Sequence, residues 1–555
     1  MNKIISESPT EQQQTSVGRR SFAAMAGVLL SRASGVVRTV IINAVFGANV
    51  KMDAFNTAFR FPNSLRDLFA DGALSAAFMK VLVDEIQNDN GDEKALISIV
   101  MGFFLSITLT LSLIAVIFAK PFIQLVSTHT FAQSGGLLLA THMFQMLAFY
   151  LPITMLNAVV MAVLGVHNMN FRAMNGSLFL SVGMISGALG LAPIFHYLGS
   201  NSIYGLTIGA LLGACFQLIY QIWPLFKLKL IKRPCFPLTV WRHSQALKNM
   251  LIMMAPRALG QGASTLALMI NTFFAIQIGQ GAMTYIATTV IIVQVPIGLF
   301  GVATGFASLP VLTDAINRKA INQFSQLFVE SIDITLWLAL FTVMAFALFI
   351  VPAYTLIFQH GKIHYFDTLQ NCLAICAYAS GILFSAGSKI LINGLYVLNR
   401  TRYIVYNSLL YLLLNAALTA MLAPKFGLIG LGLAYGFASA GNFWLNYYLV
   451  YYAFRQGKYG YSPYSAGGKM YLNKLVAFSL LTFVTSLIGV WLVEQFWMRY
   501  HAIFNMNLTA IMAIAILIFA GGIFATIVFI LTYYSGPPSL QRICQQCILK
   551  LRGIK

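Results

Sequence analysis

Long apolar runs are the feature that most constrains how this chain can fold. Runs of about 20 residues with few charges recur from residue 21 to residue 534, and each is long enough for a helix to cross a bilayer. Hydrophobic residues make up 59% of the chain and charged residues 9%, against about 25% charged in a typical soluble domain. The runs do not alternate with period two, which argues against a transmembrane β-barrel. The sequence therefore predicts an all-α polytopic membrane protein and excludes a soluble enzyme, a DNA-binding module and a disordered chain.

We predict about fourteen transmembrane helices from these runs. The spans at 54–86 and 282–313 are long enough to be bent or to lie partly in the membrane interface. The predicted spans are 21–47, 54–86, 97–124, 137–165, 176–198, 203–228, 248–278, 282–313, 330–357, 367–398, 402–423, 427–454, 471–494 and 507–534.

The placement of positive charge predicts the orientation of the chain. With a cytoplasmic N-terminus, the inside segments hold 23 of the 35 lysines and arginines, and the outside loops hold five. Lysine and arginine accumulate in cytoplasmic loops, so both termini are expected to be cytoplasmic. The net charge of +20 thus reflects membrane topology, and no nucleic acid partner is expected. The first twenty residues contain no short apolar segment with a cleavage site, so we expect nothing to be removed there.

A basic loop at residues 229–247 divides the spans into six before it and six after it. The segments Phe61–Leu82 and Val295–Leu312 resemble each other, because each has an early proline, then Leu-Phe, small residues and a closing Val-Leu. These features predict two six-helix lobes related by a parallel pseudo-two-fold axis, followed by two C-terminal helices. The expected divisions are a cytoplasmic N-terminal segment (1–20), an N-lobe (21–228), the basic cytoplasmic linker (229–247), a C-lobe (248–454), the last two helices with their preceding loop (455–534) and a cytoplasmic tail (535–555).

Charged residues inside the first two spans are the main indication of function. Each costs about 2.5 to 3.5 kcal/mol at the bilayer centre, so eight of them in this short region cannot face lipid. They are Arg32, Arg38, Asp53 at the outer edge, Arg60, Arg66, Asp67, Asp71 and Lys80.

Two interpretations of these charges remain open. One is a hydrated central cavity lined by arginines, with Pro62 breaking or kinking the helix beside it. The other is a set of ion pairs between helices, in which Asp67 and Asp71 neutralise two cations and Lys80 extends to the inner interface. The arginines outnumber their acidic partners, which favours the cavity. Guanidinium groups suit carboxylate and phosphate, so the cavity is expected to attract an anion.

The rest of the chain offers no catalytic or metal motif. Cys544 and Cys547 form a lone CxxC without further ligands, and His142 is interpreted as an interior histidine that is hydrogen-bonded. Asn271, Asn415 and Thr419 are expected to form hydrogen bonds between helices, although neutral oxygens of this kind also suit a cation. We therefore predict a transporter rather than an enzyme, with no cofactor and an unknown coupling ion.

The segment Ser31–Leu82 resembles the opening of the MurJ (MviN-type) lipid II flippases of the multidrug/oligosaccharidyl-lipid/polysaccharide exporter superfamily. It carries Ser-Arg, Gly-x-x-Arg, Phe-Gly-Ala, Asp-Ala-Phe, Pro-Asn-x-x-Arg and Phe-Ala-x-Gly-Ala in the family's order. Pro296–Leu312 similarly matches the family's PxGxxGxAxGxxxLPxL pattern in span eight. Fourteen spans in two lobes with an extra pair agree with the family over the whole chain.

This resemblance implies a multi-pass protein of the bacterial inner membrane that acts in peptidoglycan and cell wall synthesis. Such a protein moves lipid II, the undecaprenyl-diphosphate-linked precursor, to the outer leaflet by alternating access. Lipid II and membrane lipids are then the expected partners, and a monomer is the expected state. By motif, the resemblance implies substrate-facing cations at four arginines and an acid near the outer gate. These residues are Arg32, Arg38, Arg60 and Arg66, with Asp53 as the acid.

Two positions depart from the family pattern. The span-eight arginine falls on Ile291, and the second residue of the span-two Arg-Arg pair is Asp67. Arg257 and Lys389 are the candidates to replace the lost cation, and we include Arg257 in the predicted site. The alternatives are a flippase for another polyprenyl-linked glycan and a multidrug antiporter of the same superfamily, although an antiporter for cationic drugs would be expected to collect carboxylates.

Overall fold

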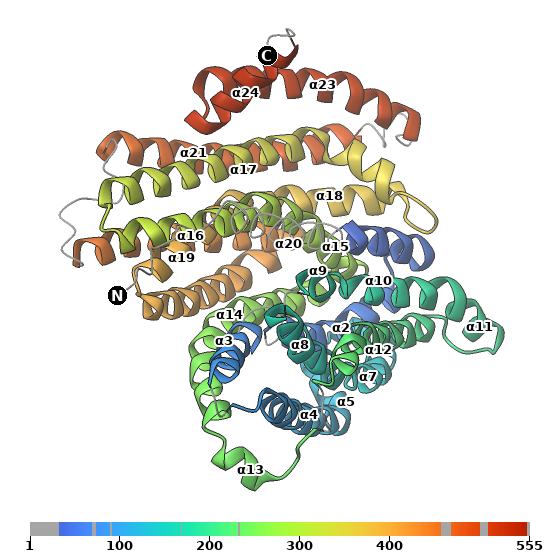
Figure 1. Cartoon of the computed structure of the whole chain (residues 1–555). Helices are drawn as coiled ribbons and strands as arrows, with labels where there is room; N and C mark the ends of the chain where they lie inside the picture. Colours follow the sequence, from blue (N-terminus) through green and yellow to red (C-terminus); the bar gives the residue numbers. More distant parts are fainter. Residues whose placement is uncertain are drawn as a thin grey trace, which may run out of the picture. The chain divides into compact units, whose positions relative to one another are not determined.

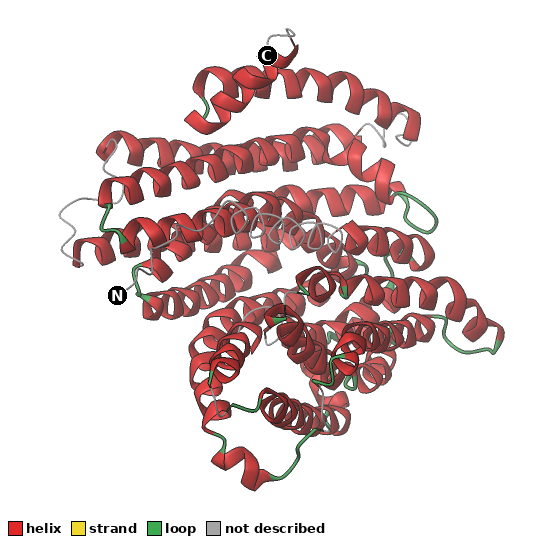
Figure 2. Cartoon of the chain, viewed as in Figure 1, coloured by secondary structure: helices red, strands yellow, loops and turns green. Residues whose placement is uncertain are grey.

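The structure is a computed structural model that describes residues 33–68, 74–88, 91–167, 169–230, 234–456, 468–499 and 509–551. Within these ranges all regular structure is helical and no strand occurs (Figure 2). Nine helices of the described chain are long and apolar enough to cross a membrane, and the bent pair Tyr365–Ala379 and Ile382–Val397 would make a tenth. The predicted all-α polytopic fold is confirmed, while the count of fourteen spans stays a prediction.

The chain forms two compact units (Figure 1). Unit 1 comprises Met1–Ile42, Ala58–Phe122 and Ala140–Ala258, and unit 2 comprises Asn43–Thr57, Ile123–Leu139 and Leu259–Lys555. The lobe boundaries expected from the sequence stay predictions.

The core of unit 1 is formed by helices from the first half of the chain: α3 (Leu74–Gln87), α4 (Glu93–Ile117) and α12 (Ile203–Lys227) pack on α8 (Tyr150–Val166). In chain order the helices up to residue 278 are Ala33–Phe46, α2 (Val50–Leu68), α3 (Leu74–Gln87), α4 (Glu93–Ile117), α5 (Ala119–Val126), α6 (His129–Gln133), α7 (Gly136–Leu147), α8 (Tyr150–Val166), α9 (Asn170–Asn175), α10 (Ser177–Ser186), the π-helix η2 (Gly187–Leu191), α11 (Ala192–Tyr197), α12 (Ile203–Lys227), α13 (Leu238–His243) and α14 (Gln245–Ile278).

Glycines let α10 and η2 approach α12 closely. A Cβ atom on Gly183 would lie 2.3 Å from the Cα of Gly213, and one on Gly187 would lie 2.7 Å from the Cα of Gly209. Small residues at four-residue spacing are the usual means by which membrane helices pack backbone against backbone. This contact joins the fifth and sixth predicted spans.

The basic linker is attached to α4. The backbone N–H of Cys235 donates to the carbonyl of Ser98 at 3.0 Å, and the indole of Trp241 donates to the carbonyl of Cys235 at 2.8 Å. The Trp241 ring also meets Phe103 edge to face, with centroids 5.5 Å apart. The part of the linker that the structure describes is therefore packed against unit 1.

Unit 2 is built around α17, which packs against α18, α19, α21 and α23. Figure 1 shows α17 and α21 side by side, with α23 and α24 next along that side of the unit. Its helices are α15 (Ala282–Pro296), the π-helix η3 (Ile297–Val302), α16 (Ala303–Asn317), α17 (Ile321–Phe358), α18 (Tyr365–Ala379), α19 (Ile382–Val397), α20 (Thr401–Gln456), α21 (Gly468–Trp491), the π-helix η4 (Leu492–Met498), α23 (Ala510–Ser535) and α24 (Pro538–Leu551).

The interruptions of the helices agree only in part with those expected from the sequence. A break at Pro62 is ruled out, because α2 continues through this residue to Leu68, while a kink there stays a prediction. The tenth predicted span is instead two helices, α18 and α19, bent by 40°. In α20 the helical conformation fails at Gly427, with φ 56° and ψ −129°, which is the predicted boundary between spans eleven and twelve.

Candidate substrate site

Two of the predicted arginines meet around one tyrosine in unit 1. Arg66, in the last turn of α2, donates from Nη1 to the Tyr150 hydroxyl at 3.4 Å. Arg38, on the helix Ala33–Phe46, interacts electrostatically with both Tyr150 and Arg66. Tyr150 is fully buried, while both arginines are half-buried. The structure therefore groups two cations and a phenol from three different helices.

Aromatic packing holds this group in place. The ring of Tyr150 meets Phe59 edge to face at 5.3 Å between centroids. Phe61 packs on Phe122 and Phe144, at 4.9 and 5.9 Å. Tyr150 opens α8 and Phe59 precedes Arg60 on α2, so these contacts fix α2 against α8. Arg60 is half-buried on α2 and lies between Phe59 and Phe61 in the sequence.

The structure describes the other residues of the predicted site, and their charged neighbours, only in part. Arg32 and Asp71 lie outside the described residues, and the structure describes the backbone but not the side chains of Asp67 and Arg257. Lys80 is exposed on α3. Ile291, at the position of the family's span-eight arginine, is half-buried in α15. The second-lobe part of the predicted site thus stays a prediction.

Asp53 is buried and holds the N-terminus of α15. Its side chain is only 4% exposed, and it accepts hydrogen bonds from the Gly281 N–H at 2.6 Å, the Thr284 N–H at 3.0 Å and the Thr284 hydroxyl at 2.7 Å. A carboxylate at a helix N-terminus is favoured by free N–H groups and by the helix dipole. Burial nevertheless raises the pKa of Asp53 to about 6, and the three hydrogen bonds limit this rise.

Further hydrogen bonds surround Asp53 within unit 2. Asn43 donates to the Thr288 hydroxyl at 3.0 Å, and Asn56 donates to the Thr284 hydroxyl at 3.3 Å. The Lys362 N–H donates to the carbonyl of Ala44 at 2.9 Å. The segment 43–57 is therefore tied to α15 and to the loop before α18 by side chains that the sequence alone did not identify.

Polar residues elsewhere in unit 2 form contacts between helices. Thr419 donates to Asn271 at 3.0 Å across α20 and α14, as predicted for interhelical hydrogen bonding. Lys474 on α21 forms an ion pair with Asp333 on α17 at 2.9 Å, which the sequence did not identify. Within the described part of the chain, no group of three or more His, Cys, Asp or Glu side chains could hold a metal ion.

Comparison with known proteins gives one family. The family profile described as lipid II flippase MurJ matches residues 42–511. A lipid II flippase MurJ from Burkholderia cenocepacia is 28% identical over 442 residues, which cover 78% of this chain and 83% of that protein.

Two solved structures share the fold. A lipid II flippase MurJ in an inward closed conformation has a TM-score of 0.65 at 20% identity, covering 87% of this chain and 99% of its own. An inward-facing multidrug resistance MATE family transporter of the MOP superfamily has a TM-score of 0.62 at 16% identity, covering 78% and 99%. At these identities the likeness establishes the fold alone, so the fold does not separate a flippase from an antiporter, whereas the family profile does.

Proposed function

The chain belongs to the lipid II flippase MurJ family, and we propose that it moves lipid II to the outer leaflet of the bacterial inner membrane by alternating access. In this proposal the protein is a monomer, both termini are cytoplasmic, and no bond of the substrate is made or broken. The observation that carries the proposal is the grouping of Arg38 and Arg66 around Tyr150.

The chemistry of these cations supports a diphosphate ligand. Each guanidinium presents a planar fork of donors that can bind two phosphate oxygens at once. Arg38 and Arg66 repel each other, so an anion with two phosphate groups relieves this repulsion. Arg60, Arg32 and Arg257 are proposed to add to the same anion site. A cationic drug would be repelled, which disfavours the multidrug antiporter.

We assign Asp53 to the outer gate rather than to direct substrate contact. Its carboxylate already accepts three hydrogen bonds from the start of α15, so it has little capacity left for a ligand in this conformation. Release of these bonds would free the segment 43–57 from α15. The proposed cycle therefore opens the outer side by breaking this contact and closes it by re-forming the contact.

Complementation tests the proposal. The native chain, Arg38→Ala and Arg66→Ala would each be expressed in bacteria depleted of their own lipid II flippase, and outer-leaflet lipid II would be followed. We expect rescue by the native chain and at least a tenfold loss of transport in both variants. The matched control is Arg318→Ala, because Arg318 is an exposed arginine paired with Asp314, and this variant should rescue.

The possible failures have different meanings. Rescue by Arg38→Ala and Arg66→Ala would refute an arginine-lined pathway while leaving flippase activity intact. Absence of rescue by a well-inserted native chain would shift the substrate to another polyprenyl-linked glycan, which the same cations could bind.

A further inference from the structure

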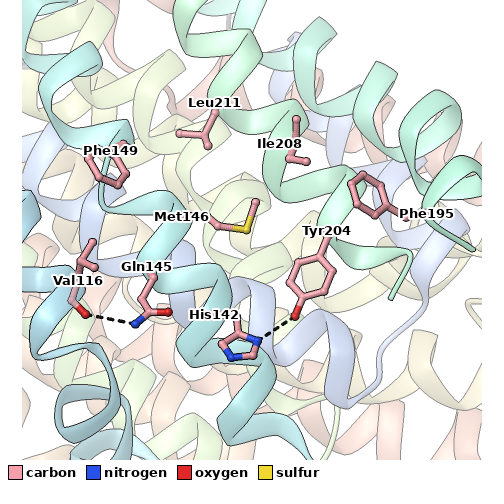
Figure 3. Close-up of a pocket in the computed structure, with 9 residues that line it drawn as sticks. All are labelled: Val116, His142, Gln145, Met146, Phe149, Phe195, Tyr204, Ile208 and Leu211. Atoms are coloured by element: carbon pink, nitrogen blue, oxygen red, sulfur yellow. Dashed lines mark hydrogen bonds between the residues drawn. The ribbon is translucent and has the colours of Figure 1, made fainter. Parts of the chain in front are cut away.

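A cavity in unit 1 has a lining that includes none of Arg38, Arg66 and Tyr150. This cavity of about 750 Å³ opens among α4, α7, α11 and α12. Its lining is mainly apolar, with Met146, Phe149, Phe195 and Ile208 among the residues that form it (Figure 3). The cavity is open to its surroundings over most of its extent, so a ligand can enter it from the membrane.

The polar groups gather at one end of this cavity. Figure 3 shows His142 and Tyr204 pointing toward each other, with His142 Nδ1 3.2 Å from the Tyr204 hydroxyl. Gln145, one turn along α7 from His142, donates to the carbonyl of Val116 at 3.3 Å. His142 is exposed, so its expected interior place is wrong, whereas its expected hydrogen bond is present. The pair therefore forms part of the cavity lining, and the donor that the His142–Tyr204 hydrogen bond does not use can bind a ligand.

The surroundings of the cavity are apolar, and the segments that form them lack acidic side chains. Ile117 on α4 is 73% exposed and Tyr197 on α11 is 91% exposed, as expected where a membrane protein faces lipid. Residues 112–150 and 190–212, which include the whole lining, contain no aspartate or glutamate. The same segments contain exposed Lys120 and His196. An apolar chain with an anionic head is the complementary ligand.

The position along the helices suggests which leaflet supplies this ligand. Val116 is near the end of α4, His142 is near the start of the candidate membrane span Gly136–Val166, and Tyr204 is in the first turn of α12. These are the ends of the predicted spans that face outward in the proposed topology, and in this respect the inference rests on the proposed function. The cavity would then lie in the outer half of the membrane, with its polar pair toward the headgroups.

We infer that this cavity binds one acyl chain of an anionic glycerophospholipid, with the lipid phosphate at His142 and Tyr204. Its volume suits an acyl chain and glycerol better than a full polyprenyl tail, so the ligand is a bulk membrane lipid rather than the transported substrate. The bound chain would fill the space between α4 and α12.

Lipid retention by the purified full-length protein tests this inference. Delipidated protein in detergent would be titrated with phosphatidylglycerol or phosphatidylcholine, and retained lipids would be counted by native mass spectrometry. We expect one phosphatidylglycerol to bind at least fivefold more tightly than phosphatidylcholine. Ile208→Trp should abolish this binding by filling the cavity. The matched control is Ile219→Trp on the same helix, because Ile219 is 57% exposed and is not part of the lining, and it should bind as the native chain does.

A second variant separates the headgroup from the chain. His142→Gln should lower the preference for phosphatidylglycerol over phosphatidylcholine without changing retention of phosphatidylcholine, and thermal unfolding would verify that each variant is folded. Equal retention of the two lipids by the native chain, or equal binding by Ile208→Trp and Ile219→Trp, would overturn the inference. Displacement of phosphatidylglycerol by equimolar undecaprenyl phosphate would also overturn it in favour of a polyprenyl ligand. Lipid II transport in the same preparations reports separately on the proposed function.

Discussion

At the scale of single residues, Arg38 and Arg66 bring two charges of the same sign to one buried tyrosine. The contact that the structure records for Arg66 is with a neutral phenol at 3.4 Å, and the neighbouring charge at Arg38 has the same sign. Two guanidinium groups beside one tyrosine repel each other and attract an anion. Such a site is stabilised when an anion enters, which is the property that an anion carrier requires.

Asp53 gives a prediction of pH dependence. Its pKa in the closed contact is about 6 because of burial, whereas a hydrated aspartate titrates near 3.9. The closed form therefore binds a proton more tightly than an open form in which Asp53 is hydrated. Lowering the pH from 7 to 5 should stabilise the closed contact by about tenfold, and this stabilisation should be lost as the pH rises through about 6.

The measurement is the labelling rate of a cysteine introduced at Thr288 in a chain without its native cysteines. Thr288 is 1% exposed beside Asn43, so a thiol reagent reaches it only when the contact opens. Asp53→Asn in the same background is the control, because it keeps the pH dependence of the reagent and of the rest of the chain but removes the carboxyl group. Identical pH profiles with and without Asp53→Asn would refute the prediction.

The identities of these residues could be predicted from the sequence, but their partners could not. Arg38, Arg66 and Asp53 are conspicuous because charges are rare in and beside apolar runs. Tyr150 follows Arg66 by 84 positions, and Thr284 follows Asp53 by 231. Hydroxyl groups are common in membrane helices, so only the tertiary structure identifies which of them meets a charge.

At the scale of helices, hydropathy predicts the apolar segments better than their interruptions. Residues 203–228 were predicted as one span and α12 is Ile203–Lys227, because the whole run is apolar. The bend between α18 and α19 lies inside an equally apolar run. A Cβ atom on Gly381, at this bend, would lie 2.3 Å from the ring of Tyr435. Packing against another helix thus accompanies a bend that composition does not predict.

The contact of η2 with α12 gives a prediction at this scale. Gly187→Ala would place its Cβ 2.5 Å from the carbonyl oxygen of Gly205 and 2.7 Å from the Cα of Gly209. Overpacking of this kind costs about 1 to 3 kcal/mol, so the variant should unfold at a lower temperature in detergent. Gly190→Ala is the matched control in the same π-helix, since nothing lies within 4 Å of the added Cβ. Equal thermal stability of the two variants would refute close packing here.

At the scale of the whole molecule, the family profile extends over residues 42–511, so the recognised pattern includes parts of both units. The sequence predicts a division near the basic linker, and it does not predict that the segment 43–57 belongs with unit 2. The reason is physical, since Asn43 and Asp53 form hydrogen bonds to α15 that no local pattern specifies. The chain before and after this segment belongs to unit 1. Breaking the bonds between the segment and α15 would therefore release a part of unit 2 that is joined through the chain to Arg38 on one side and to Arg66 on the other.

The transport cycle predicts a dependence on membrane potential with a definite sign. A potential that is negative inside favours outward movement of an anionic headgroup by about 2.3 kcal/mol per net charge per 100 mV, roughly 50-fold in the distribution between leaflets. The empty site carries the positive charges of Arg38 and Arg66, so the same potential also favours its return toward the inside. Proteoliposomes holding lipid II, with the potential set by a potassium gradient and valinomycin, should export faster when the cytoplasmic face of the protein is negative. Reversing the gradient should slow export, and a rate that does not depend on its sign would refute transport of net charge by this molecule.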